Sequence, residues 1–219
     1  MRAGLALTDE GDALYHALRD LEPGDFDRPT GCPPWTVRDL LAHVHTAVRR
    51  TLDMLEGPTP AAAEVDAVGY YRPDHRFDAA ADAERVAAAQ RETTDGQSLV
   101  DGIADACRRV AAAGPADRLV TTRHGDAMTL DDFVVTRVVE VAVHGVDLAL
   151  ALDRPPWTTQ AARRVVLDLF PAAAHAAAEQ FGWDDQMFLA KATGRAPLVG
   201  AEREAAPAIA HLTLAPTSI

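Results

Sequence analysis

Hydrophobic residues recur every three or four positions along several stretches of the chain, and this period predicts a mostly helical protein. The first stretch runs from about residue 9 to 21, with Thr8 as its expected N-cap. A second begins near Thr36 and continues to about residue 56, where Gly57 and Pro58 end it. A third covers about residues 79–113, and we expect a break in it near residues 93–96.

The second half of the chain begins with a different pattern. Residues 118–128 favour a small β-hairpin with His124 in its exposed turn. Thr129 followed by Asp132 is typical of a capping box and predicts a helix that continues to about Leu152.

Two further helical patterns follow, over about residues 158–180 and 184–192, and Pro171 should kink the first or end it early. We therefore predict an all-α protein apart from the hairpin: an antiparallel four-helix bundle over residues 1–155 and a short helical C-terminal appendage over residues 156–219.

Charge narrows the range of partners. Acidic residues outnumber basic ones by 33 to 21, so the net charge is −12. This balance argues against nucleic-acid binding, which needs clustered cations to neutralise phosphates. The sequence contains no stretch near 18 uninterrupted apolar residues, and Asp9 and Glu10 come too early for a signal peptide. Cys32 and Cys107 provide no disulfide framework. We expect a cytoplasmic protein with no membrane partner.

Candidate chemistry is concentrated in the predicted helix that ends near Leu152. Glu140 and His144 are four residues apart and share one side of an otherwise apolar helix, with Arg137 and Asp147 one turn before and after them. A buried carboxylate needs a partner. Either Arg137 or another base pairs with Glu140 and His144 is a hydrogen-bonded core histidine, or a divalent cation binds Glu140 and His144 while Arg137 or Asp147 orients the ligands.

A histidine on another helix favours the metal hypothesis. His43 lies beside the apolar stripe of the second predicted helix, and metal sites in bundles are built from facing helices. His45 lies about 200° further round that helix, so we expect it at the surface or facing a loop. Trp35 is expected to pack at the start of the helix.

These segments carry a resemblance. The string from Cys32 to His43, CPPWTVRDLLAH, and the later pattern R-x-x-E-x-x-x-H-x-x-D over residues 137–147 resemble the mycothiol-dependent maleylpyruvate isomerases, a family of the DinB-like metalloprotein superfamily. The resemblance implies that His43, Glu140 and His144 bind a divalent metal. It also implies mycothiol, a low-molecular-weight thiol of actinobacteria, as cosubstrate. Zinc is the expected metal, although the same ligands would accept nickel or iron.

The resemblance implies an enzyme whose metal activates the thiol to attack a small electrophile, either as an S-transferase or as a thiol-dependent isomerase. The isomerases use an arginine from a larger C-terminal domain, and here Arg195 is the corresponding candidate for substrate binding, with His75 as a second. Cys32 is not expected to act as a nucleophile. A metal-dependent hydrolase with Asp147 as base, a non-catalytic binding protein and a metal-free bundle remain as alternatives. We expect a monomer or a homodimer.

Overall fold

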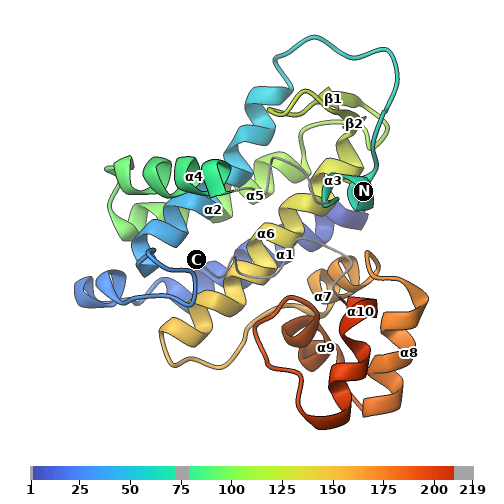
Figure 1. The fold of residues 1–219 in the computed structure, drawn as a ribbon. Helices are drawn as coiled ribbons and strands as arrows, with labels where there is room; N and C mark the ends of the chain where they lie inside the picture. Colours follow the sequence, from blue (N-terminus) through green and yellow to red (C-terminus); the bar gives the residue numbers. More distant parts are fainter. Residues whose placement is uncertain (1, 73–78, 210–219) are drawn as a thin grey trace.

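The computed structural model describes residues 2–72 and 79–209 and confirms the prediction of a mainly helical protein (Figure 1). The elements are α1 (Arg2–Leu18), η1 (Pro23–Asp27), α2 (Val37–Met54), α3 (Ala67–Tyr70), α4 (Ala79–Arg91), α5 (Gly96–Ala111), β1 (Leu119–Thr121), β2 (Ala127–Thr129), α6 (Leu130–Ala151), α7 (Gln160–Leu167), α8 (Ala172–Phe181), α9 (Asp185–Ala192), η3 (Gly200–Ala205) and α10 (Ala206–Ile209).

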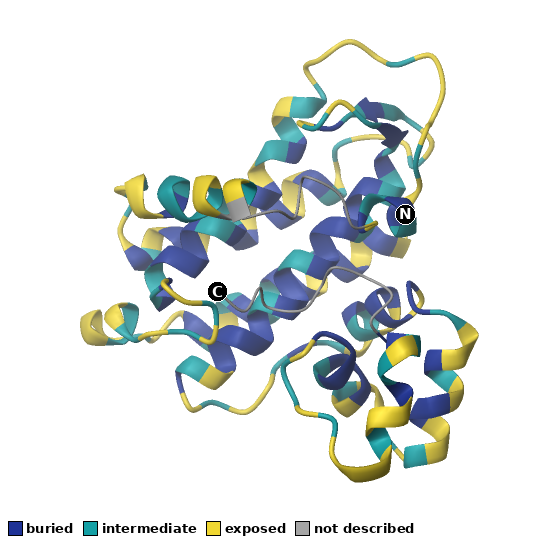
Figure 2. Cartoon of the chain, viewed as in Figure 1, coloured by how far each residue is buried: buried dark blue, intermediate teal, exposed yellow. Residues whose placement is uncertain are grey.

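The core lies between α1, α2, α5 and α6. Helices α1 and α2 each pack against both α5 and α6, so the four form a bundle with α1 and α2 at opposite corners. Helix α6 is buried along most of its length, as expected for a helix that is apolar on nearly every side (Figure 2). Helix α4 packs on α2, and α7 carries the C-terminal helices against α1 and α6.

Two predicted helix starts are confirmed. The hydroxyl oxygen of Thr36 accepts a hydrogen bond from the backbone N–H of Asp39, and the Asp39 carboxylate accepts one from the Thr36 N–H in return. The hydroxyl of Thr129 caps α6 in the same way by accepting from the N–H of Asp132. These caps fix where α2 and α6 begin, and so set the rotation of the two helices that carry the candidate ligands.

The predicted start of the first helix is wrong. Helix α1 begins at Arg2 instead of residue 9, and the hydroxyl of Thr8 donates to the carbonyl of Gly4 within the helix. The reason is burial, because Leu7 and the alanines before it lie in the core. The break predicted near residues 93–96 is confirmed by the end of α4 and the start of α5, and Pro171 separates α7 from α8.

The predicted hairpin is confirmed. Strands β1 and β2 pair antiparallel with Val120 opposite Met128, and Gly125 has a positive φ of 92° in the turn, a conformation that glycine adopts without steric cost. The division of the chain at residue 155 stays a prediction. Among the described helices, none is both long and apolar enough to cross a lipid bilayer.

A buried carboxylate connects the bundle to the C-terminal helices. Glu10 of α1 is fully buried, and one of its oxygens accepts a hydrogen bond of 2.8 Å from the backbone N–H of Thr159, the N-cap of α7. The other oxygen and the nearby indole nitrogen of Trp157 have no hydrogen-bond partner among the described residues. Burial is the main reason why the pKa of Glu10 is raised to about 7.

Candidate metal centre

Three side chains from two helices converge at the middle of the bundle. His43 comes from α2, and Glu140 and His144 come from successive turns of α6. The Nε2 atom of His43 lies 3.3 Å from Oε2 of Glu140, and Nε2 of His144 lies 3.6 Å from the same oxygen. One ligand atom from each residue lies within 4.8 Å of the other two. We refer to these three residues as the ligand triad.

The spacing of the ligand triad matches a shared ion. In a tetrahedral zinc site with bonds of about 2.0–2.1 Å, two ligand atoms are separated by roughly 3.3–3.5 Å. The two distances at the Glu140 oxygen are close to this value, so little movement of the side chains is needed. Two imidazole nitrogens and one carboxylate oxygen are also ligands that zinc, nickel and iron accept.

The ring of His43 is held by Trp35. The two rings are stacked with their centroids 4.7 Å apart and 29° between their planes, and the indole also meets the ring of His144 edge-on at 6.4 Å. Trp35 is buried, so it packs at the start of α2 as expected. A stacked aromatic neighbour restricts rotation of the imidazole and keeps its Nε2 atom directed at Glu140.

Arg137 holds the second oxygen of the glutamate. Its guanidinium lies 3.8 Å from Oε1 of Glu140, donates to the backbone carbonyl of Ala47 at 2.9 Å and stacks over the ring of Phe133. The cation is therefore fixed from three sides. It compensates the carboxylate charge whether or not an ion is bound, which means that these contacts also match the metal-free hypothesis.

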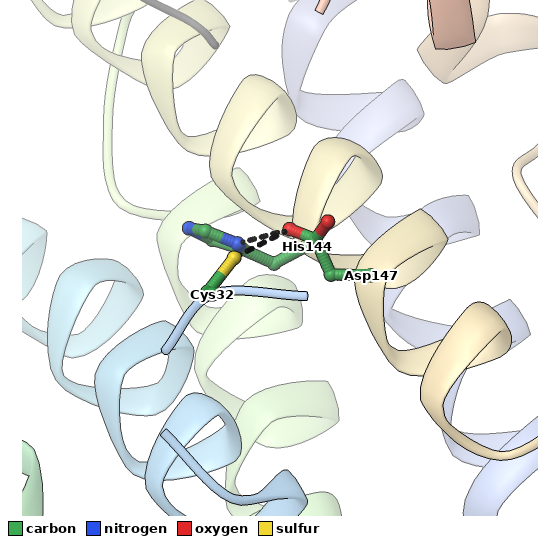
Figure 3. Close-up of side chains that lie close together, drawn as sticks. All are labelled: Cys32, His144 and Asp147. Carbon is green, nitrogen blue, oxygen red and sulfur yellow. Dashed lines mark hydrogen bonds and ion pairs between the residues drawn. The ribbon is translucent and has the colours of Figure 1, made fainter. Parts of the chain in front are cut away.

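Asp147 occupies the opposite side of His144. Its Oδ2 atom lies 2.9 Å from Nδ1 of the imidazole and accepts a hydrogen bond of 3.3 Å from the thiol of Cys32 (Figure 3). Arg195 donates to both carboxylate oxygens, at 3.0 Å and 2.8 Å. An imidazole whose Nδ1–H is held by a carboxylate presents its Nε2 lone pair to the ligand triad, which is the arrangement found at histidine metal ligands.

In the metal-free protein, burial and neighbouring charges determine which residues of the ligand triad are protonated. Burial alone would raise the pKa of Glu140, but the hydrogen bond with His43 and the charge of Arg137 hold it well below its ordinary value. Burial alone would lower the pKa of His144, yet its contacts with Asp147 and Cys32 raise the pKa to about 10. Burial lowers the pKa of His43. A cation at the ligand triad would have to displace the proton of His144.

The ligand triad opens into a large cavity of about 1160 Å³. Its walls come from α2, α4, the hairpin, α6 and the segment at Arg195, and they include Cys32 and Tyr71 as well as the triad. An open position beside three protein ligands distinguishes catalytic metal sites from closed structural ones.

The remaining histidines and Cys107 do not belong to the ligand triad. His75 is outside the described residues. His45 is partly buried against Gly102 of α5, so its expected surface position is wrong. His124 lines the cavity and is hydrogen-bonded by Arg123, so it is not simply a solvated turn residue. Cys107 is fully buried, as expected of a packed residue.

Sequence reasoning missed the role of two residues. Cys32 lies against Asp147 although 115 positions separate them, and Arg195, expected to contact substrate, is bound to the same carboxylate. The sequence gives one signal for Asp147: it is an acidic residue on an otherwise apolar helix, and a buried carboxylate needs a partner. The sequence could not identify those partners, since both arrive through loops.

The fold and the ligand triad define a helical-bundle protein with a candidate site for one divalent cation beside a cavity. Residues 7–149 match the sequence model of the mycothiol maleylpyruvate isomerase N-terminal domain. The chain belongs to this family, because the match covers more than half of its length and includes the whole ligand triad. No curated protein and no solved structure matches the chain.

Proposed function

We propose that the chain is a metal-dependent enzyme that uses a low-molecular-weight thiol to attack a small electrophile, as an S-transferase or as a thiol-dependent isomerase. The observation that carries this proposal is the ligand triad, whose two histidines and one glutamate lie at ligand spacing on the wall of a cavity. The name of the family to which the chain belongs includes mycothiol and maleylpyruvate, so mycothiol is the proposed thiol.

Zinc is the proposed ion, with nickel or iron as alternatives, and His43, Glu140 and His144 would hold it. A bound dication lowers the pKa of a thiol from about 8.5 and makes the thiolate available at neutral pH. Trp35 then keeps the His43 ring in place. Asp147 keeps the His144 proton on Nδ1, and Arg137 compensates the charge of Glu140.

The position of Asp147 argues against the hydrolase alternative. A hydrolase needs a base close to the metal, and Asp147 was the candidate for this role. Both of its oxygens are engaged by Arg195. Burial alone would raise the pKa of Asp147, but its hydrogen bond with His144 and the contacts with Arg195 hold that pKa well below the ordinary range. A carboxylate held in this way is a weak base, so it serves better to orient His144 than to accept a proton from water.

The first test of the proposal is elemental analysis of the purified protein beside His43→Ala and Glu140→Ala. We expect about one equivalent of zinc, nickel or iron in the wild type and a loss of the metal in both variants. His16→Ala is the matched control, because His16 is exposed on α1 and far from the ligand triad in the sequence. This control should retain the metal.

Turnover separates an enzyme from a binding protein. The loaded protein should consume thiol together with a suitable electrophile, whereas a binding protein would retain one ligand and consume none. Absence of metal from the wild type after reconstitution would contradict the proposal and support a bundle in which Glu140 is simply ion-paired with Arg137.

A further inference from the structure

The charge of the cavity wall is opposite to that of the protein. The chain carries a net charge of −12. The described residues that line the cavity nevertheless include six arginines and only three acidic residues. The arginines are Arg50, Arg85, Arg91, Arg123, Arg137 and Arg195, and the acids are Asp53, Glu84 and Glu140. Low-dielectric walls lined by one sign of charge attract ligands of the other sign.

Two of these arginines already have carboxylate partners. Arg137 faces Glu140 and Arg195 holds Asp147, so their charges are compensated within the protein. Arg50 is different. It is partly buried in the wall, and within residues 2–72 and 79–209 its guanidinium makes neither a hydrogen bond nor an ion pair. The nearby carboxylate of Asp53 is bound instead by Arg49, at 3.4 Å.

The neighbours of Arg50 make its position costly. Burial lowers its pKa first, and the positive charges of Arg123, Arg49 and Arg137 lower it further. The negative charge of Asp53 raises the pKa, but the net shift is downward, so a further negative group beside the partly buried guanidinium would stabilise it. Such arrangements are typical of binding sites, where the ligand supplies the missing charge. Guanidinium groups bind carboxylate and phosphate through two parallel hydrogen bonds.

The helix geometry fixes the distance of this group from the ligand triad. His43, Ala47 and Arg50 line the cavity from one face of α2, and Arg50 lies seven residues after His43. Seven residues are two helical turns, or about 10 Å along the axis. Arg123 of the hairpin turn also lines the cavity, and it is near enough to Arg50 for its charge to lower the pKa of Arg50. A ligand that reaches both ends must therefore be elongated.

We propose that Arg50 and Arg123 form a subsite for the carboxylate or phosphate group of an elongated ligand whose reactive end lies at the ligand triad. The subsite deepens the proposed function, because it makes the electrophile an anion with its charge remote from the reacting carbon. The two arginines bind and position this group, and they take no part in the chemistry. Carboxylate and phosphate share the feature that the subsite requires: each is a compact anionic group that can accept two hydrogen bonds from a guanidinium.

The test measures binding of simple anions to the metal-free, full-length protein, so that coordination to a metal does not contribute. Glutarate and inorganic phosphate are the two probes, and neutral glutaramide is the control for glutarate. We expect saturable binding of at least one anion by calorimetry and at least about tenfold weaker binding of glutaramide. Arg50→Gln and Arg123→Gln should each weaken anion binding by about tenfold or more, as expected for loss of a charge-assisted hydrogen bond.

Arg109→Gln is the matched control. Arg109 is exposed on α5, is ion-paired with Asp105 and does not line the cavity, so its loss should leave anion affinity unchanged. Thermal unfolding without ligand checks that Arg50→Gln folds, and its midpoint should equal or exceed that of the wild type because repulsion among the arginines falls. A preference for glutarate or phosphate identifies which anionic group the ligand carries.

Equal affinity of wild type and Arg50→Gln, equal affinity for glutarate and glutaramide, or no saturable anion binding would each overturn the subsite. The result is separate from the proposed metal function. His43→Ala should lose metal but keep its affinity for the anion. A protein that binds anions at Arg50 but never binds metal would sustain the subsite and remove the enzyme proposal.

Discussion

The guanidinium of Arg195 and the carboxylate of Asp147 form a two-point ion pair that joins the C-terminal segment to α6. Nε donates to Oδ1 at 3.0 Å and Nη2 to Oδ2 at 2.8 Å, and the two side chains are only 4% and 3% exposed. The same Oδ2 atom faces Nδ1 of His144. The ion pair therefore fixes the side of the imidazole opposite to the ligand triad.

Replacing Arg195 should weaken the metal site without touching a ligand. Arg195→Gln is expected to lower metal affinity by roughly 10- to 100-fold, the range typical for partners that orient a ligating histidine. Arg195→Lys should retain only part of the wild-type metal affinity, because lysine is a point charge and cannot bind both carboxylate oxygens in parallel. Competition with a chromophoric chelator measures the affinity. Arg203→Gln, which alters an exposed arginine of the same segment, should have no effect.

The ion pair should also appear in the stability of the metal-free protein. Arg195→Gln leaves the buried charge of Asp147 without its main partner, which typically costs about 3–5 kcal/mol. Adding Asp147→Asn removes that charge and should restore a large part of the loss. Urea unfolding of the single and double variants measures both effects. Equal stability of Arg195→Gln and wild type would mean that the ion pair contributes little.

The two cysteines should differ sharply in reactivity. Cys32 is partly exposed and lines the cavity, whereas Cys107 is fully buried and burial raises the pKa of its thiol to about 12. We expect iodoacetamide to modify the native protein once and the unfolded protein twice, as measured by intact mass. Cys107→Ser should still take up one adduct and Cys32→Ser none. Two adducts on the native chain would show that the α1–α5 contact opens readily.

Glu10 predicts a specific dependence of stability on pH. Its pKa is raised from 4.5 to about 7 by burial, so the folded protein binds this proton more tightly than the unfolded chain. Protonation of Glu10 therefore contributes roughly 3 kcal/mol to the free energy of unfolding. This contribution is fully present below about pH 4.5 and is lost as the pH rises through 7. Glu10→Gln should remove this part of the pH dependence. Urea unfolding between pH 5 and 8 tests this prediction. It would be refuted by a free energy of unfolding that changes equally with pH in the wild type and in Glu10→Gln.

Close contact between α1 and α5 predicts the effect of one added methyl group. A Cβ atom at Gly11 would lie 2.7 Å from Cβ of Cys107, so Gly11→Ala must push the helices apart. We expect a loss of about 1–3 kcal/mol in the free energy of unfolding. Gly31→Ala is the control, since nothing lies within 4 Å of the added atom there. A neutral Gly11→Ala would show that the helices adjust freely.

The sequence predicts much of this protein because its strongest signals are local. The helical period, the Thr36 and Thr129 caps and Pro171 determine most element boundaries from residues within a few positions. The start of α1 was missed because Thr8 and the acids after it imitate an N-terminus, while burial of Leu7 extends the helix. Tertiary burial overrode the local signal there.

The candidate site also combines local features that the sequence predicts with tertiary contacts that it does not. Glu140 and His144 share a helix face at a spacing that can be seen in the sequence, and the resemblance adds His43. The partners of Asp147 are invisible in the sequence, because Cys32 and Arg195 reach it across 115 and 48 positions through loops. Among the described residues Arg50 has no ion-pair partner, and this is equally hidden in the sequence, since it depends on where the hairpin and α4 lie.

The ion pair between Arg195 and Asp147 has an evolutionary consequence. The family domain matches residues 7–149, yet a group that holds its helix comes from residue 195. Relatives that lose the acid at position 147 should lose the arginine too, and relatives with a different C-terminal segment need a new cation for the same carboxylate. The two positions should thus change together, and natural selection would act on the bundle and the C-terminal segment as one inherited unit.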